Sequence, residues 1–352
     1  MFWHRLTQLD TTSLSLPAFG NGVDIRQFIS IMRMVLVGVK LIKVISMQSF
    51  SRASVFWGTS LSILGVFAPP MIESAKADEN LLGYTVGAET TPKGGNELYL
   101  WNTVHTGKRQ GSYRADYFRL EYERGLTDDL SASVYLNGYR HNYSGSPVPG
   151  EIEGGLKQTK LSGFSVEVKK MLLSPYKDDL GVALYGELTY DTVDSITGAG
   201  IRGWEIETKL IFQKPFMDGQ LQWLTNIELE AETAKDNTSG MVESALAPRL
   251  RSGVSYRFAP NWSIGAEGWV DMEVLNAAAD PTEPGSGGWE FDHWDFFAGP
   301  SIHYGAKDWW FTLTWAHQWA GSSEQVGFNN RTNLHLADHE RNEVRLKVGY
   351  NF

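Results

Sequence analysis

The last ten residues of the chain alternate between apolar and polar side chains up to a terminal aromatic residue. One side of this alternation consists of Val344, Leu346, Val348, Tyr350 and Phe352. The other side carries Arg345, Lys347 and Asn351. Because successive side chains of a strand point to opposite faces, the pattern predicts a β-strand with one wholly apolar face. A strand of a soluble protein can alternate in this way, but it rarely does so up to a terminal aromatic residue.

The composition of the chain favours strands of the same kind throughout. Aromatic residues make up 12% of the 352 residues, with 13 Trp and 14 Tyr, and there are 36 Gly. The mean hydropathy is only −0.26. A transmembrane β-barrel needs such a composition, because each strand crosses the bilayer in about ten alternating residues and the hydropathy averages out. A soluble all-β sandwich or barrel has a similar composition with less Trp.

The absence of cysteine excludes disulfide bonds and cysteine-ligated metals, and the charge balance disfavours nucleic acid as a partner. The sequence has no Cys, so disulfide bonds and cysteine-ligated metals are excluded. The chain carries 31 Lys and Arg against 41 Asp and Glu. Seven of the basic and three of the acidic residues lie in residues 1–77, which leaves the remainder with a net charge of −14. No basic patch is visible, so nucleic acid is not an expected partner.

Residues 1–77 have the features of a targeting segment rather than of a folded domain. Arg52 precedes an apolar run over residues 53–68, and Ala-Lys-Ala at residues 75–77 matches a small-x-small cleavage site. This order of features predicts a secretory signal peptide over residues 47–77, cleaved at its end.

The segment that precedes this signal peptide, residues 1–46, is predicted to be an over-extended start without structure. It contains a second apolar stretch over residues 28–45, which Arg33, Lys40 and Lys43 interrupt. An inner-membrane anchor is the alternative, and the three cations disfavour it.

Alternating segments with turn sequences between them recur along the rest of the chain. The expected strands span residues 97–107, 113–123, 130–140, 159–170, 181–191, 203–213, 220–232, 247–258, 262–274, 292–304 and 309–320, followed by the strand that closes at Phe352. Short turns follow the even-numbered strands, and longer loops rich in Gly, Ser, Asn and Pro follow the odd-numbered ones. The longer loops include residues 142–156, 277–288 and 321–337.

This alternation of connections is the layout of an outer-membrane barrel, with periplasmic turns, extracellular loops and both ends in the periplasm. The predicted fold is therefore all-β, a single antiparallel transmembrane β-barrel of about twelve strands over residues 97–352. Residues 78–96 are predicted to form a periplasmic N-terminal segment. Outer-membrane lipid is the expected surrounding of the barrel.

The two faces of each expected strand suit lipid on one side and an aqueous interior on the other. In residues 220–232 one face consists of Leu221, Trp223, Ile227 and Leu229. The other face consists of Gln222, Asn226, Glu228 and Glu230. Several Trp lie near strand ends, where aromatic girdles are found. They are Trp204, Trp223, Trp262, Trp294, Trp309 and Trp319.

Four stretches resemble a family of uncharacterised bacterial outer-membrane β-barrel proteins. They are residues 91–98 (TPKGGNEL), 118–128 (FRLEYERGLTD), 172–178 (LLSPYKD) and 205–214 (EIETKLIFQK). The family implies a fold and a location, and it carries no established substrate or catalytic residue. The chain end also resembles the closing strand of such barrels, in which a C-terminal aromatic residue is part of the assembly signal. That resemblance implies that Tyr350 and Phe352 are read by the barrel-assembly machinery.

Charged side chains concentrate on the inward face of four consecutive expected strands. They are Glu205, Glu207, Glu228, Glu230, Glu232, Arg249, Arg251, Arg257, Glu267 and Asp271. We expect Glu230 and Glu232 to approach Arg249 and Arg251 across one hairpin. One interpretation is a charged constriction that sets the selectivity of a channel. The other is a lumen filled by ion pairs that satisfy one another.

The function predicted from these features is a porin-like channel for small solutes, in which the excess of carboxylates favours cations. The alternative is a non-transporting structural or surface-interaction barrel with a closed lumen. An outer-membrane lipid hydrolase is a third candidate. Ser301 and His303 lie close in sequence, and His141 and His317 lie near strand ends, but they form no recognisable Ser–His–acid spacing. We therefore predict no enzyme activity and no cofactor.

One group of residues has the composition of a metal site without a closed set of ligands. His335, Asp338 and His339 lie in the last long loop. Since no fourth ligand is evident at a recognisable spacing, we expect a solvated loop and no metal site.

Overall fold

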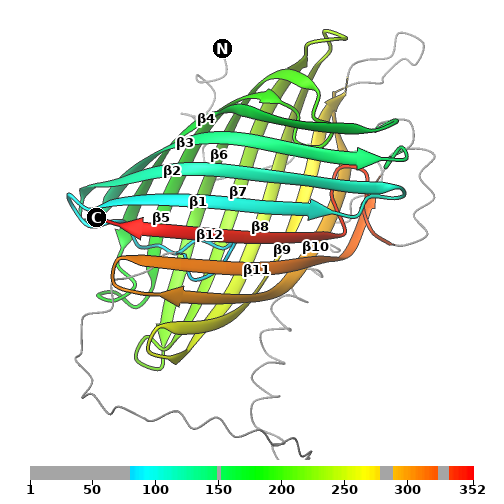
Figure 1. Cartoon of the computed structure of the whole chain (residues 1–352). Coiled ribbons are helices and arrows are strands. Elements are labelled where there is room, and N and C mark those ends of the chain that lie inside the picture. Colours follow the sequence, from blue (N-terminus) through cyan, green and yellow to red (C-terminus); the bar gives the residue numbers. More distant parts are fainter. Residues whose placement is uncertain (1–79, 149–151, 278–287, 324–332) are drawn as a thin grey trace, which may run out of the picture. The chain divides into compact units, whose positions relative to one another are not determined.

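The computed structural model describes residues 80–148, 152–277, 288–323 and 333–352. Its strands are β1 (Asn96–Thr106), β2 (Ser112–Thr127), β3 (Leu130–Ser144), β4 (Leu156–Leu173), β5 (Gly181–Val193), β6 (Gly200–Phe216), β7 (Leu221–Asp236), β8 (Val242–Ala259), β9 (Trp262–Ala277), β10 (Gly288–Gly305), β11 (Trp309–Ser323) and β12 (Asn342–Asn351). They form one closed antiparallel barrel in chain order (Figure 1). The all-β, twelve-strand barrel predicted from the alternation is confirmed. The predicted signal peptide and the segment upstream of it lie outside the described residues.

Closure of the barrel joins the first strand to the last. In the β1–β12 register, Leu98 lies opposite Tyr350 and Leu100 lies opposite Val348. Beyond the end of β12, the Phe352 amide donates to the Asn96 carbonyl at 3.0 Å, and the Asn96 amide donates to the Phe352 carbonyl at 3.2 Å. The terminal residue therefore completes the ladder, and closure leaves no strand edge unpaired.

The connections follow the expected alternation only in part. Tight turns follow the even-numbered strands, as predicted. After β1, β5 and β7, however, the connections are also short. Around the last two of these connections, the flanking strands run two to five residues past their predicted ends. At the end of β7, Asp236 accepts hydrogen bonds from the amides of Thr238 and Ser239, at 2.9 and 2.5 Å. Such aspartate turns reverse the chain in few residues, so β7 and β8 stay paired to their ends.

The outer face of the barrel is apolar across the middle of the strands. On five neighbouring strands, paired side chains form a continuous row of Val348, Leu100, Leu120, Leu136 and Phe164. Each of them is at least 38% exposed. A closed barrel with such an outer face satisfies its backbone hydrogen bonds internally and presents hydrocarbon to lipid. The protein is therefore a transmembrane barrel of the kind that spans the outer membrane of Gram-negative bacteria.

Tryptophans near the strand ends extend this outer face, as the sequence predicts. Trp204, Trp309 and Trp319 are exposed, whereas Trp269 and Trp310 point inward and are buried. Among the described residues, no helix is long and apolar enough to cross a membrane.

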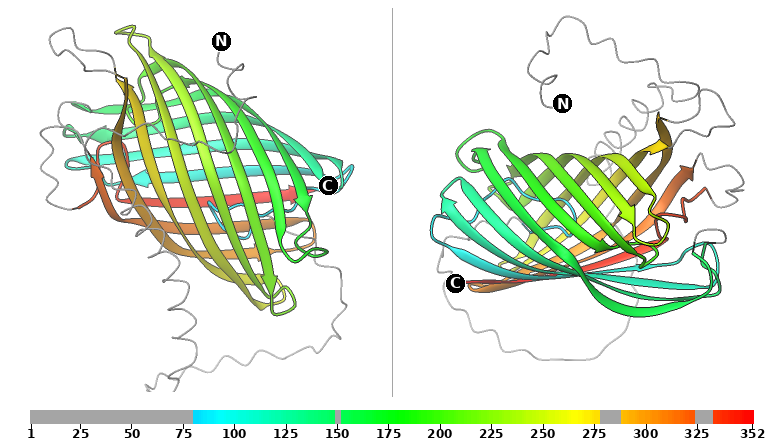
Figure 2. Two further views of the ribbon diagram at one scale, coloured as in Figure 1. Left: turned by 180° about the vertical axis from the view of Figure 1, so that it is seen from behind. Right: turned by 90° about the horizontal axis from the view of Figure 1, so that it is seen from above.

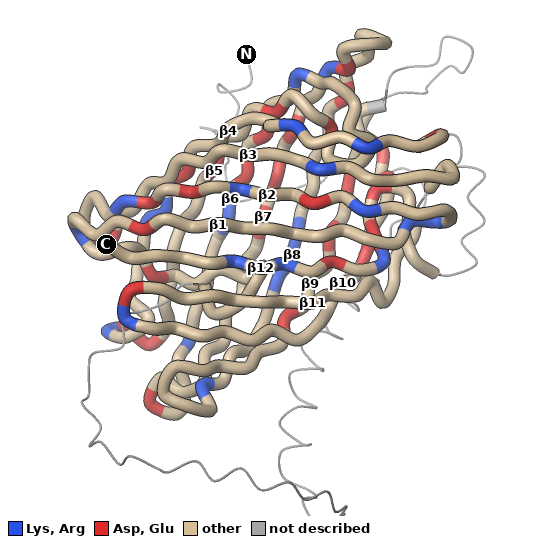
Figure 3. Tube along the Cα trace, viewed as in Figure 1, with Lys and Arg blue, Asp and Glu red and all other residues tan. Residues whose placement is uncertain are grey.

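Charged residues occur along the full length of the strands as well as at their ends (Figure 3). On β7, Asn226 and Glu228 are buried, while Ile227 and Leu229 are almost half exposed. The face that the sequence predicts to be polar is therefore the one that the barrel encloses.

The chain that precedes β1 folds into the barrel. Residues 80–89 lie within the ring of strands, and Leu82, Tyr84 and Ala88 are buried there (Figure 2). The sequence predicts a periplasmic segment over residues 78–96, and the structure corrects that prediction for residues 80–89. Their apolar side chains and backbone amides find partners on the inner wall that no local pattern indicates.

Candidate functional site

An ion-pair network on β6–β9 brings together most of the charged residues that the sequence singles out. Arg249 lies at its centre and forms a charge-assisted pair with both oxygens of Glu230. Its Nε lies 3.1 Å from Asp271 Oδ1, and its Nη1 lies 4.0 Å from Glu207 Oε1. The neighbouring Arg251 donates from Nε to Glu228 Oε2 at 2.9 Å.

The network also contains a cation that the sequence analysis did not select. Lys209 Nζ lies 3.1 Å from Glu207 Oε2 and 3.9 Å from Glu228 Oε1. Arg251 Nη2 adds a contact of 3.8 Å to Asp271 Oδ1. Charges therefore alternate around the group, which offsets the cost of enclosing them.

Register explains which of the expected pairs form. Glu230 reaches Arg249 diagonally, because Glu228 lies directly opposite Arg249 in the β7–β8 ladder. Arg251 pairs with Glu228, since Asn226 is its direct neighbour. Glu232 lies opposite Ala245 and Glu205, so the expected approach of Glu232 to an arginine is wrong.

Three of the predicted lumen residues do not line the free interior. Glu228 is buried beneath Arg251. Arg257 lies at the turn end of β8, eight residues along the strand from Arg249, and it forms no ion pair with any described residue. Glu267 is covered by the segment that enters the barrel. The remaining predicted residues form the walls of a cavity.

A second charged group lies on β2–β5, across the lumen. Arg119 pairs with Glu187 from β5, and its guanidinium lies 3.8 Å from the centre of the Tyr135 ring. The Tyr135 hydroxyl donates to Glu121 Oε1 at 2.9 Å and also contacts Glu167. The sequence places Arg119 and Glu121 on the inward face. It could not place Arg119 in a site, because its partner Glu187 lies three strands further along the chain.

The two groups face a cavity of about 370 Å³ inside the barrel. Thirteen carboxylates and seven Lys or Arg side chains line it, so the formal charge of its walls is negative. Six Tyr and two Trp share the lining. Tyr84 and Val86 contribute to it from the entering segment, and Asp338, His339 and Glu340 contribute from the last loop. The cavity thus extends between these two chain segments.

The segment 80–89 is held to the wall mainly through its backbone. Glu267 on β9 accepts hydrogen bonds from the amides of Gly83, Tyr84 and Thr85, at 2.7, 3.0 and 2.8 Å. The Thr85 hydroxyl adds a fourth at 3.0 Å. A carboxylate that accepts this many hydrogen bonds is fixed in position. Glu267 therefore holds residues 80–89 against the wall, and we call this set of hydrogen bonds the clamp.

Two amide side chains extend this clamp toward β1. Asn226 accepts from the Val86 amide at 2.8 Å and donates to the Val86 carbonyl at 2.9 Å, as a neighbouring strand would. Gln213 accepts from the Ala88 amide at 2.7 Å. The backbone polar groups of the segment are thus satisfied without a strand partner.

Leu82 fits a recess that two glycines create in the wall. A Cβ added at Gly253 or Gly265 would lie 2.5 or 2.6 Å from a Leu82 methyl group. Gly83 itself lies so close to the wall that its added Cβ would meet Thr314 Oγ1 at 2.5 Å. The fit requires glycine on both sides of the contact.

Tyr84 fixes the segment to β9 and β12 through its side chain. Its hydroxyl donates to Glu343 Oε2 at 2.7 Å, and its ring lies between Trp269, at 4.2 Å, and the Arg345 guanidinium, at 3.7 Å. Burial and the nearby Glu343 carboxylate raise the pKa of Tyr84 well above its usual value. The phenol is therefore a neutral donor at every physiological pH.

The last loop closes against the other end of the cavity through a buried cation. Lys108 follows β1, and its Nζ donates to the carbonyls of Ala337, Asp338 and His339 at 2.6, 2.9 and 3.1 Å. It also lies 3.0 Å from Glu340 Oε1. Burial alone would raise the pKa of Glu340, but the charges of Lys108 and His105 outweigh burial and lower it to about 2.

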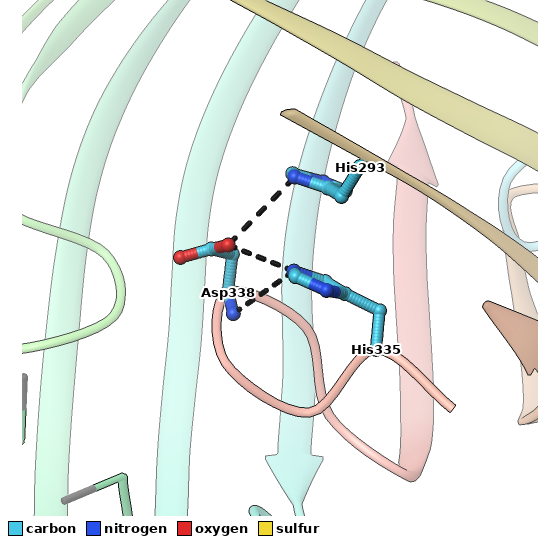
Figure 4. Close-up of side chains that lie close together, drawn as sticks. All are labelled: His293, His335 and Asp338. Atoms are coloured by element: carbon cyan, nitrogen blue, oxygen red, sulfur yellow. Dashed lines mark hydrogen bonds and ion pairs between the residues drawn. The ribbon is translucent and has the colours of Figure 1, made fainter. Parts of the chain in front are cut away.

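The same loop carries the residues that the sequence assigns to a solvated surface. Instead, the His335 side chain is fully buried, and Asp338 lies beside the rings of His335 and of His293 from β10, with Oδ2 2.7 Å from His335 Nε2 and 3.7 Å from His293 Nδ1 (Figure 4). His339 packs against His293 as well. The expectation of a solvated loop is wrong, because Lys108 draws the loop backbone onto the inner wall.

The histidines considered for catalysis occupy structural positions. His303 Nδ1 lies 2.8 Å from Thr312 Oγ1, which in turn donates to the Asn80 carbonyl. His141 Nε2 lies 2.9 Å from the Ser195 carbonyl oxygen, and His317 Nδ1 lies 2.9 Å from Asn342 Oδ1. These contacts hold strands, loops and the entering segment together.

Three solved structures illustrate the similarity of the barrel to known folds. A COG4313 outer membrane channel from Pseudomonas putida F1 has a TM-score of 0.52 at 13% identity, covering 75% of this chain and 98% of that one. The translocator domain of the autotransporter NalP from Neisseria meningitidis has a TM-score of 0.43 at 12% identity, covering 73% and 88%. LpxR from Salmonella typhimurium has a TM-score of 0.38 at 9% identity, covering 72% and 99%. At 13% identity the first similarity bears on the fold alone.

Sequence comparison identifies the family. A search of curated proteins finds no match to the chain. The model of a family of unknown function, DUF6662, matches residues 74–352 and so spans the whole barrel. The resemblance to an uncharacterised family of outer-membrane barrels, noted in the sequence, is thereby confirmed. The chain belongs to the DUF6662 family of unknown function, as a bacterial outer-membrane β-barrel.

Proposed function

We propose that the barrel is a channel for small hydrophilic solutes that prefers cations to anions. The observation that carries the proposal is the charged cavity inside a lipid-facing barrel. Its walls carry 13 carboxylates and seven Lys or Arg side chains. Fixed charge on the walls of a narrow space raises the local concentration of ions of the opposite sign.

The individual contacts indicate which carboxylates are free to act on a solute. Glu228 and Glu230 are engaged by Arg251 and Arg249, so their charges are largely compensated. Glu232 lines the same cavity, is exposed, and forms no ion pair with any described residue. Its carboxyl group is therefore the best placed to interact with a cation in the lumen.

Single-channel conductance in planar bilayers tests the proposal, with the protein purified without a tag. In a salt gradient the wild type should pass current with a reversal potential of the sign expected for cation preference. Glu232→Gln should move that potential toward zero, because it removes a lumen charge without leaving an arginine unpaired. Asp218→Asn is the matched control. Asp218 is exposed in the β6–β7 turn and has a φ of 55°, a conformation that Asn also tolerates.

A folded barrel is recognised by its altered gel mobility after heating. Silent bilayers with protein that passes this check would reject the channel and favour the alternative, a closed barrel whose ion pairs fill the lumen. Equal shifts for Glu232→Gln and Asp218→Asn would reject the cavity as the origin of selectivity.

A further inference from the structure

Three histidines from two distant parts of the chain meet at the loop end of the lumen. His293 lies on β10, and His335 and His339 lie in the loop that precedes β12. The Nε2 atoms of His293 and His339 are 3.1 Å apart. His339 Nε2 is also 3.0 Å from Asp295 Oδ2. Two imidazole nitrogens and a carboxylate oxygen thus converge on one point.

We propose that His293, His339 and Asp295 form a binding site for a divalent transition-metal ion of the zinc class. Zinc takes imidazole and carboxylate ligands at about 2.0–2.1 Å in a tetrahedral arrangement, which sets neighbouring ligand atoms about 3.4 Å apart. The two measured separations, 3.1 and 3.0 Å, need to open by only a few tenths of an ångström. One coordination position would remain for water or for a solute in the cavity, which His339 lines.

The buried state of Asp295 supports the assignment independently of this geometry. Asp295 has no exposed surface, and apart from the contact with His339 Nε2, neither of its carboxylate oxygens has a hydrogen-bond donor among the described residues. An uncompensated carboxylate in such a position is costly, and a bound cation removes that cost. An orphaned buried acid aimed at two histidines is an expected property of an empty metal site.

Two carboxylates near Nδ1 of His293 orient its imidazole ring for metal binding. Its Nδ1 lies 2.8 Å from Asp292 Oδ2 and 3.7 Å from Asp338 Oδ2. A carboxylate at Nδ1 fixes the proton on that nitrogen and leaves the lone pair of Nε2 free for a metal, an arrangement common to metal-bound histidines. Asp292 and Asp338 are therefore positioning residues.

His335 is not itself a proposed ligand of the metal, but it packs against His293 and holds a neighbouring carboxylate. Its ring stacks on that of His293 with centroids 4.1 Å apart and planes inclined by 6°. Its Nε2 lies 2.7 Å from Asp338 Oδ2, so it holds the carboxylate that faces His293 (Figure 4). A metal site in this position does not depend on the barrel being a channel.

Zinc binding to the untagged, detergent-purified barrel tests the proposal after the protein has been stripped with a chelator. We expect one Zn²⁺ per chain, measured by competition with a chromogenic zinc indicator, and no comparable binding of Mg²⁺ or Ca²⁺, which prefer oxygen ligands. His339→Ala and Asp295→Asn should weaken binding by more than about a hundredfold. Asp292→Asn should weaken it by about 10–100-fold, as expected for a partner of a ligand. His317→Ala, a histidine that contacts Asn342 elsewhere in the barrel, is the control.

A measurement on the wild type keeps the proposal testable if a variant fails to fold. Zinc should protect His293 and His339 from acylation by diethyl pyrocarbonate, as read by mass spectrometry, while the reaction of His317 stays unchanged. The site is rejected if folded protein binds no zinc or if zinc leaves the acylation of His339 unaltered. It is also rejected if His317→Ala weakens binding as much as His339→Ala does.

Discussion

Chain segments enter both ends of the lumen, and they are held to the wall in different ways. At the turn end, residues 80–89 are fixed largely through backbone amides, with Glu267, Asn226 and Gln213 as acceptors. At the loop end, residues 335–340 are fixed by ionisable groups, above all Lys108 and the histidines. At the turn end the backbone amides and the side-chain amides of Asn226 and Gln213 do not titrate, and Glu267 is the titratable acceptor, whereas several histidines and Glu340 lie at the loop end. The difference predicts a narrowing at the turn end that depends little on conditions and a narrowing at the loop end that depends on them more.

Deleting residues 80–89 should have the largest effect on this contrast. The deletion removes the segment that fills the turn end and leaves the loop end intact. We expect conductance in planar bilayers to rise several-fold, while heat-modifiable mobility shows that the barrel still assembles. An unchanged conductance would place the barrier at the loop end and reverse the comparison.

Lys108→Met should release the loop end. Breaking a buried ion pair by removing one partner costs about 3–5 kcal/mol, because the other charge is left uncompensated. Here the change leaves Glu340 with His105 as its remaining partner and frees three loop carbonyls. Limited proteolysis within residues 333–341 should become faster, and the rate should stay at the wild-type level in Lys157→Met, where the lysine is exposed on β4.

The attachment of the loop should weaken with acid over a defined range. The pKa of Glu340 is lowered to about 2, so its contribution is fully present above pH 4.5, its usual pKa, and is lost as the pH falls toward 2. That shift corresponds to about 3 kcal/mol. The proteolysis rate of the loop, measured after brief acid exposure with an acid-active protease, should rise over this range. Glu340→Gln should show a flatter profile, and a profile as steep as that of the wild type would contradict the assignment.

The smallest effect is expected from Glu267→Gln. The substitution keeps the size of the side chain, but the amide nitrogen that replaces one carboxylate oxygen cannot accept a hydrogen bond. The hydrogen bonds to that oxygen are therefore lost and those to the other oxygen become neutral, a loss of about 1.5–3 kcal/mol. The segment should then exchange its amide hydrogens faster at Gly83, Tyr84 and Thr85. Glu232→Gln, which alters a lumen carboxylate that does not contact the segment, should leave that exchange unchanged.

The fold was predictable because its main signal is local. Alternation with a period of two residues identifies each strand and its apolar face, as in the stretch from Val344 to Phe352. The strand ends were less predictable. Asp236 and its turn keep β7 and β8 paired beyond the point where their outward side chains stop being uniformly apolar.

Contacts within the site could be predicted only between residues on the two strands of one hairpin. Glu230 and Arg249 lie on adjacent strands joined by one short connection, so their approach follows from the sequence. Glu267 binds amides that lie 184 residues earlier, at Gly83, and no periodic pattern connects them. The metal site likewise joins His293 on β10 to His339 in the loop before β12, and no periodic pattern places that loop against β10.

The recess for Leu82 has a consequence for the order of folding. Its walls come from Gly253 on β8 and Gly265 on β9, and the neighbouring contacts of the segment reach β11 and β12. The segment has no complete partner surface until these strands are paired. Contacts between residues so far apart in sequence form slowly, because a long loop must close before they can stabilise anything. Docking of residues 80–89 therefore belongs to the last steps of folding, after the strands that receive them have come together.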